Sequence, residues 1–204
     1  MATHTVGMNG SCDAVANAAK RLSELEKKRN KAMESSRIIT RRTKNMIHAI
    51  HVREDYAEIA NDIRRDVDDL NNYLKDEPVI YYLGVVQDAL GEYAEAFIFA
   101  SVVEKNDVPS YDSLGITPQA WLMGLADSIG EMRRMILTYL LDSDLDNARY
   151  LFDRMDSIGD DVLSFDVPDA IVPVRRKQDV ARSIIEKTRS DITNAVMLAQ
   201  YNKK

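Results

Sequence analysis

Apolar residues recur every three or four positions along almost the whole chain, which is the spacing that gathers them on one face of a helix. The alternating pattern typical of strands is scarce, and only five prolines and eight glycines interrupt the sequence. The pattern therefore predicts an all-α fold, a single elongated bundle of about six to seven helices. The predicted helices lie at about 11–51, 54–74, 78–105, 118–141, 144–163 and 174–200.

Helix boundaries are marked by capping residues and prolines. Thr117-Pro118 combines a helix cap with a proline at the first helical position, and Pro168 and Pro173 interrupt the chain before the last helix. Neither repeats nor a linker divide the chain. We expect a disordered N-terminus over residues 1–10 and one helical domain over residues 11–204.

The composition predicts an intracellular protein. A chain of 204 residues that is 45% hydrophobic can bury a core without disulfides, and its single cysteine, Cys12, has no partner. The first residues lack the features of a signal peptide, and no run of about 18 apolar residues is present. We expect a cytoplasmic protein that does not cross a membrane.

The charge distribution is more informative than the net charge of −6, which alone would argue against a nucleic-acid partner. Between Lys20 and Arg53 there are 11 lysines and arginines against three acids, a local excess of eight positive charges. Such segregation offers a polyanion one docking surface. The candidate RNA-binding residues in this segment are Arg37, Arg41, Arg42 and Lys44. A merely solvated helix face is the alternative reading.

Two pairs of acids stand out on successive helices. The helix predicted at 78–105 is apolar on nearly every side and should be buried, yet it carries Glu92 and Glu95 three residues apart on one face. Asp127 and Glu131 are four residues apart on the next helix. Burying adjacent carboxylates requires compensation by a cation, by arginines or by shared protons.

Metal binding is one way to compensate these four acids. Facing helices that each offer two carboxylates can hold hard cations such as Mg²⁺ or Mn²⁺, which activate water for attack on a phosphodiester. Gly84, Gly91, Gly124 and Gly130 would let the helices approach closely nearby. The alternative is ordinary ion pairing, because Arg133 and Arg134 follow Glu131 directly.

The histidines suggest a different metal site, but the sequence supports it less well than a site made of the four acids. His48 and His51 with Glu54 could suggest a carboxylate-bridged di-iron site, but the Glu-x-x-His spacing of such bundles is absent. We therefore expect both histidines to be surface or RNA-facing groups. No phosphate-binding loop, zinc pair or catalytic triad pattern is present.

Several segments together resemble the translin family. Residues 37–51 are similar to the family's basic first helix, and Glu92-Tyr-Ala-Glu-Ala96 looks like the EYVEA motif of its Trax-type subunits. Residues 121–131, ending in Glu131, resemble the YLLGxADLTGE motif, and residues 174–180 resemble the start of the family's last helix. The resemblance runs from roughly residue 37 to residue 196.

This resemblance implies a barrel-like homo-octamer that binds RNA, with single-stranded DNA as a further possible ligand. In Trax-type subunits the acids of the two motifs form a Mg²⁺-dependent endoribonuclease site, which corresponds to Glu92, Glu95, Asp127 and Glu131. All four acids are present, so the chain looks Trax-like. The basic motif that translin carries before this region is missing from residues 79–87.

The sequence thus predicts a Mg²⁺- or Mn²⁺-dependent endoribonuclease that acts on short or structured RNA inside a hollow homo-oligomer. The alternatives are a non-catalytic RNA- or DNA-binding scaffold of the same fold, with its acids paired to arginines, and a purely structural oligomer.

Overall fold

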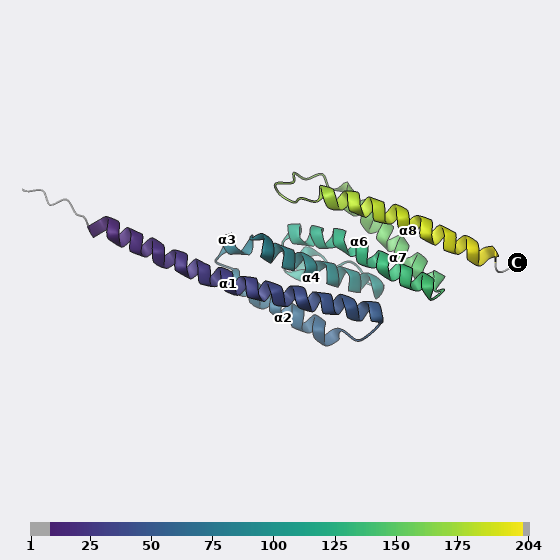
Figure 1. The fold of residues 1–204 in the computed structure, drawn as a ribbon, viewed down its shortest axis with the longest axis horizontal. Coiled ribbons are helices and arrows are strands. Elements are labelled where there is room, and N and C mark those ends of the chain that lie inside the picture. The colour runs from purple at the N-terminus through teal and green to yellow at the C-terminus, as the bar shows by residue number, and fades with distance from the viewer. Residues whose placement is uncertain (1–8, 202–204) are drawn as a thin grey trace, which may run out of the picture.

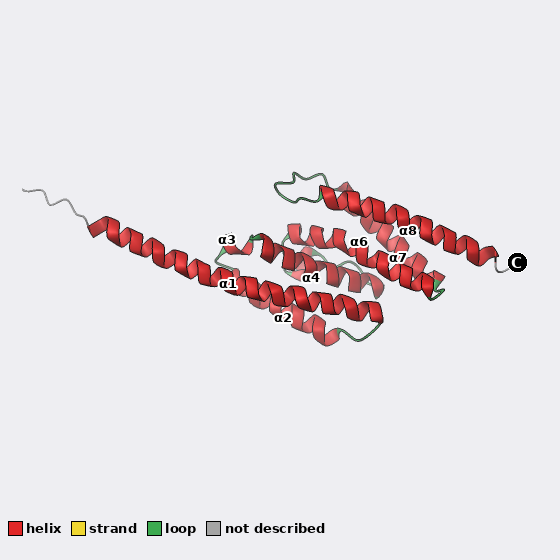
Figure 2. Cartoon of the chain, in the orientation of Figure 1, coloured by secondary structure: helices red, strands yellow, loops and turns green. Residues whose placement is uncertain are grey.

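The computed structural model describes residues 9–201, and in this range the chain forms helices and no strands (Figure 2). The all-α prediction is confirmed. The helices are α1 (Asn9–Val52), α2 (Ala57–Leu74), α3 (Pro78–Tyr81), α4 (Gly84–Val103), α5 (Tyr111–Leu114), α6 (Pro118–Leu141), α7 (Leu145–Ser164) and α8 (Arg175–Tyr201).

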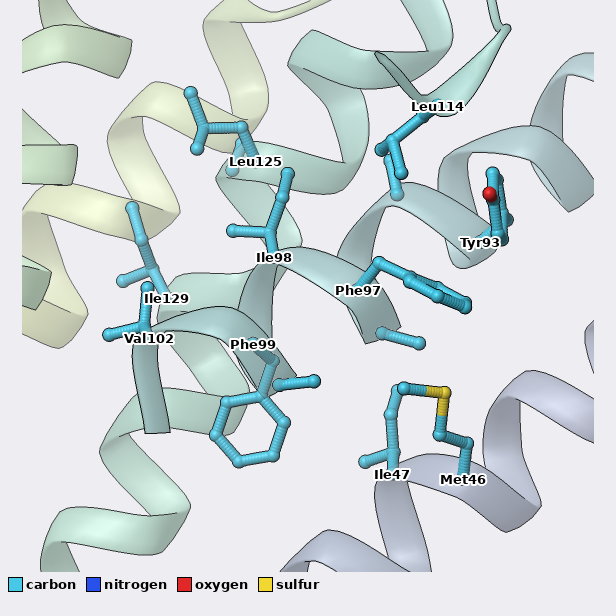
Figure 3. Close-up of a cluster of buried hydrophobic side chains, with 14 of the residues drawn as sticks. Met46, Ile47, Tyr93, Phe97, Ile98, Phe99, Val102, Leu114, Leu125 and Ile129 are labelled. Carbon is cyan, nitrogen blue, oxygen red and sulfur yellow. The ribbon is translucent and has the colours of Figure 1, made fainter. Parts of the chain in front are cut away.

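Helix α4 occupies the centre of the bundle. Figure 1 shows α1 and α2 on one side of it and α6, α7 and α8 on the other. Because neighbours cover it on several sides, 12 of its 20 residues are buried, as the apolar sequence predicted. Its side chains join α1, α5 and α6 in the core around Phe97, Ile98 and Phe99 (Figure 3).

Two local predictions were wrong. The helix predicted at 78–105 is broken, because Leu83 adopts an extended conformation with ψ 141°. The side-chain amide of Gln87 donates to the Tyr81 carbonyl at 2.8 Å and so satisfies a group that the break releases. The segment 106–116, where the sequence predicts no helix, contains the short helix α5, which Ser110 caps by accepting from the Ser113 amide.

The N-terminal part of α1 extends beyond the other helices (Figure 1), and residues 12–24 are exposed. Glu77, just before α3, connects this part of α1 to the bundle: its buried carboxylate lies 2.8 Å from Arg21 and 2.7 Å from Lys28. The disorder predicted for residues 1–10 falls mostly on residues outside the described range, and α1 includes residues 9 and 10. Between residues 9 and 201 no helix is both long and apolar enough to cross a membrane.

Candidate functional site

A glycine contact sets the distance between the two acid-bearing helices. A Cβ atom added at Gly124 of α6 would lie 2.4 Å from the Gly91 carbonyl oxygen and 2.7 Å from the Glu95 amide nitrogen of α4. Only glycine allows this approach, as predicted for this position. The same prediction was wrong at Gly84 and Gly130, where an added Cβ would meet no neighbouring atom within 4 Å.

The two acids of α4 are half-buried and have no cationic partner: in residues 12–201 no lysine, arginine or histidine forms an ion pair with Glu92 or Glu95. Burial raises the pKa of Glu92, the positive charge of Lys44 offsets part of this rise, and the nearby Asp127 adds to it. Burial also raises the pKa of Glu95, to about 8, with additional repulsion from Asp127, Glu92 and Glu131. The structure therefore brings all four predicted acids into one electrostatic neighbourhood.

The two acids of α6, in contrast, have partners. Asp127 forms an ion pair with Lys177 of α8. The Glu131 Oε2 atom lies 2.5 Å from the His51 Nε2 atom of α1 and 3.8 Å from the Arg134 guanidinium. The hydrogen bond with His51 lowers the pKa of Glu131 despite its burial.

These contacts correct part of the sequence interpretation. Arg134 does pair with Glu131, but Arg133 turns to α8, where it donates to Thr188 at 2.6 Å and to Asp191 at 2.8 Å. Sequence reasoning missed Lys177, which is 50 residues away from its partner Asp127.

His51 is also placed differently from the prediction. It is buried at 8% exposure, not on the surface, and its ring lies 5.1 Å from that of Phe99. Its Nδ1 atom has no hydrogen-bond partner among the described residues. His48 is exposed, as predicted, and so is Glu54, while His51 faces Glu131 instead.

The donor chemistry of Glu92 and Glu95 suits a hard divalent cation, because carboxylate oxygens are its usual ligands and a positive charge would relieve the repulsion between them. Within residues 9–201, however, no three His, Cys, Asp or Glu side chains lie close enough to form a complete metal site. Asp127 and Glu131 would have to leave Lys177 and His51 to complete a ligand set.

Three cavities meet at Glu92. One, of about 330 Å³, lies between α1, α4 and α6. It is lined by the half-buried Glu95 and Glu131 and by the exposed Lys44, His48 and Arg134. A second, of about 630 Å³, runs between α1 and α4. A third, of about 540 Å³, lies between α4, α6 and the segment before α8. Glu92 is thus accessible from several directions, whereas Glu95 and Glu131 line only the first cavity.

The second cavity carries most of the predicted basic surface. Arg37, Arg41 and Lys44 are exposed and line it on the α1 side. Arg42 does not belong to this surface, because the next position on a helix turns away by about 100°. It instead forms ion pairs with Asp66 and, at 3.6 Å, with Asp62 of α2.

Fold and site together define a class: an all-helical protein whose central helix holds two unpaired acids beside a basic helix face. The chain belongs to the translin family, whose model matches residues 27–190. This match includes all four acids and the three exposed basic residues.

Individual relatives agree with this assignment. A protein of Methanocaldococcus jannaschii is 31% identical over 172 residues, which cover 82% of this chain and 76% of the relative. The structure of AfC3PO in complex with duplex RNA is similar with a TM-score of 0.83 and 28% identity, over 91% of this chain and 97% of that one. The apo-NeC3PO structure, at 23% identity and a TM-score of 0.79 over 94% and 100% of the two chains, shows the same fold.

Proposed function

We propose that this protein is an RNA-binding, Mg²⁺- or Mn²⁺-dependent endoribonuclease of the Trax-like type. The observation that carries the proposal is the unpaired acid pair of α4: Glu92 and Glu95 are half-buried side by side, and the pKa of Glu95 is raised to about 8. Holding such a pair without a cation costs free energy, so the arrangement is poised to bind one.

RNA as the substrate is supported by the exposed basic surface and by the relative in complex with duplex RNA. Arg37, Arg41 and Lys44 follow one another by three or four residues on the exposed face of α1. Their cavity is continuous with the acid site at Glu92. A strand whose phosphates contact this face would therefore pass directly over the acids.

Each residue of the proposed site would have its own role in the cleavage of RNA. Glu92 and Glu95 would supply the first oxygen ligands, joined by Asp127 and Glu131. When bound, the cation supplies Lewis-acid polarisation of the phosphodiester and activation of a water. Lys44 and Arg134, which line the same cavity as the acids, would hold the phosphate. One of the four carboxylates would also orient or deprotonate the attacking water.

A second function is favoured by the ion pairs of α6. Lys177 already neutralises Asp127, and His51 binds Glu131. In a non-catalytic RNA- or DNA-binding scaffold these pairs would persist and no cation would enter. Such a scaffold would bind RNA with strong salt dependence but would show no stabilisation by Mg²⁺ or Mn²⁺.

We further propose that the chain forms a homo-oligomer, as large as an octamer. The projecting part of α1 exposes Val15 (68%) and Leu22 (65%), seven residues apart on one face. Apolar side chains repeated in this way are typical of a helix that packs against another chain. Light scattering should show several chains per particle for the wild type and smaller particles for a Val15→Glu/Leu22→Glu variant.

Cleavage of a fluorescent single-stranded RNA tests the catalytic proposal. The Glu92→Gln/Glu95→Gln variant should lose Mn²⁺-dependent cleavage by at least about a thousandfold while keeping its particle size. A Glu54→Gln/Glu58→Gln variant, which removes the same charge from an exposed position, is the matched control and should cleave normally. Full cleavage by a purified double variant of α4 would refute the assignment.

A further inference from the structure

The third cavity at Glu92 differs in its walls from the second cavity, which Arg37, Arg41 and Lys44 line. It measures about 540 Å³ and lies between α4, α6 and the segment that leads into α8. Glu92 and Asp127, two of the proposed cation ligands, line it, and so does Lys177, which forms the ion pair with Asp127. Its volume falls in the range of cavities that hold one small molecule, such as a single nucleotide.

Two large apolar side chains line this cavity and are unusually exposed. Tyr82 lies at the break between α3 and α4 and is 61% exposed. Ile171 lies in the segment before α8 and is 58% exposed. Two such groups, contributed by separate segments to one cavity, form walls suited to a flat aromatic ligand.

The cavity also contains an unused amide. Gln119 is half-buried and lines the cavity, and no described residue forms a hydrogen bond with its side chain. Gln87, in contrast, is committed: it donates to the Tyr81 carbonyl and accepts from Thr117 at 2.6 Å. An amide both donates and accepts, so Gln119 can bind the edge of a base but adds little for a simple hydrocarbon.

This third cavity is continuous with the second cavity, between α1 and α4. Gly84, Asp88 and Glu92, at successive turns of α4, line both. A Cβ added at Gly84 would meet no atom of another segment within 4 Å, so the ridge that α4 forms between the two cavities is low at this point. A nucleotide chain bound along Arg37 and Arg41 could therefore place one base across the ridge.

We propose that this cavity is a nucleobase subsite, in which Tyr82 stacks on one unpaired base of the RNA and Gln119 binds its edge. This inference rests on the proposed RNA binding and adds where one base of the RNA binds. The nucleotide next to the acids must be unpaired, because a base within a duplex cannot reach the cavity without being flipped out of the stack. The cut position therefore lies in single-stranded, looped or frayed RNA.

Binding of mononucleotides tests this subsite without requiring catalysis. Calorimetric titration of the intact protein in the absence of divalent metal would compare adenosine 5′-monophosphate with ribose 5-phosphate, which lacks the base. We expect the nucleotide to bind at least about tenfold more tightly. The Tyr82→Ala variant should lose this difference, and Tyr82→Trp should keep it because stacking is preserved.

Tyr111→Ala is the matched control, because Tyr111 is also partly exposed but lines none of the three cavities. Equal binding of nucleotide and ribose phosphate by the wild type, or an unchanged preference in Tyr82→Ala, would overturn the subsite. Neither result depends on cleavage. Conversely, loss of cleavage in the Glu92→Gln/Glu95→Gln variant with an intact base preference would leave the subsite in place, so the two proposals can fail separately.

An RNA series gives a second readout. A single abasic ribose moved along a short single strand should weaken binding by about tenfold at one position only, and Tyr82→Ala should remove this dependence on position. A uniform effect at every position would contradict a single base subsite.

Discussion

The acids of α4 and the acids of α6 lie in the same neighbourhood but are compensated differently. Glu92 and Glu95 have no cationic partner among the described residues, and the pKa of both is raised. Asp127 and Glu131 are held by Lys177 and His51, and the pKa of Glu131 is lowered. The uncompensated negative charge that would attract a cation therefore lies on α4. The acids of α6 can become cation ligands only by leaving their present partners, Lys177 and His51.

The first prediction concerns the contact between α4 and α6, which brings the two acid pairs together. Gly124→Ala should destabilise the protein by about 3 kcal/mol or more, because the new methyl group would overlap the Gly91 carbonyl and the Glu95 amide, which are backbone atoms. Gly130→Ala, in open space on the same helix, should stabilise by up to about 1 kcal/mol. Urea unfolding measures both, and similar effects of the two variants would contradict the close contact.

The unpaired state of Glu95 predicts a pH dependence. Its folded pKa of about 8 lies above the ordinary 4.5, so the folded state keeps a proton that the unfolded state releases, and stability falls as pH rises between these values. Glu95→Gln should match the wild type near pH 4.5 and exceed it by about 2–3 kcal/mol at pH 9. Urea unfolding across this range, with Glu58→Gln as the control, checks the prediction. Parallel pH profiles for wild type and Glu95→Gln would rule out a buried, uncompensated Glu95.

The paired state of Glu131 predicts the opposite pH dependence. Its lowered pKa contributes stability above pH 4.5 that is lost as the pH falls through the folded value. His51→Gln should therefore cost about 1–2 kcal/mol at pH 7 and less near pH 3. The exposed His48 provides the control, since His48→Gln should have almost no effect. Thermal unfolding at the two pH values would show whether the losses differ in this way.

The ion pair of Asp127 should have the smallest effect on stability. Lys177→Met should change the free energy of unfolding by less than about 0.5 kcal/mol, because Asp127 and Lys177 are partly solvated. The same change frees Asp127 to bind a cation and should increase the thermal stabilisation by Mn²⁺. Lys187→Met, an exposed position on α8, should leave that stabilisation unchanged. Weaker stabilisation by Mn²⁺ in Lys177→Met would mean that Asp127 is not a ligand available by exchange.

The sequence predicted most of the fold because helical periodicity and capping residues act locally. It placed five of the longer helices within a few residues and identified the α4 pair and the α6 pair as sharing faces. It missed the break at Leu83, where no proline marks the change. It also missed the His51 and Lys177 contacts, which join residues 80 and 50 positions apart and depend on the register between helices.

Titration of Mn²⁺ by calorimetry tests the role of the α4 acids most directly. At pH 7.5, where Glu95 is largely protonated, the wild type should bind Mn²⁺ with release of a proton, visible as a binding enthalpy that varies with the ionisation enthalpy of the buffer. The Glu92→Gln/Glu95→Gln variant should lose both the binding and the proton release, while Glu54→Gln/Glu58→Gln should keep them. Unchanged Mn²⁺ binding in the α4 variant, or none in the wild type, would contradict a cation site built on Glu92 and Glu95.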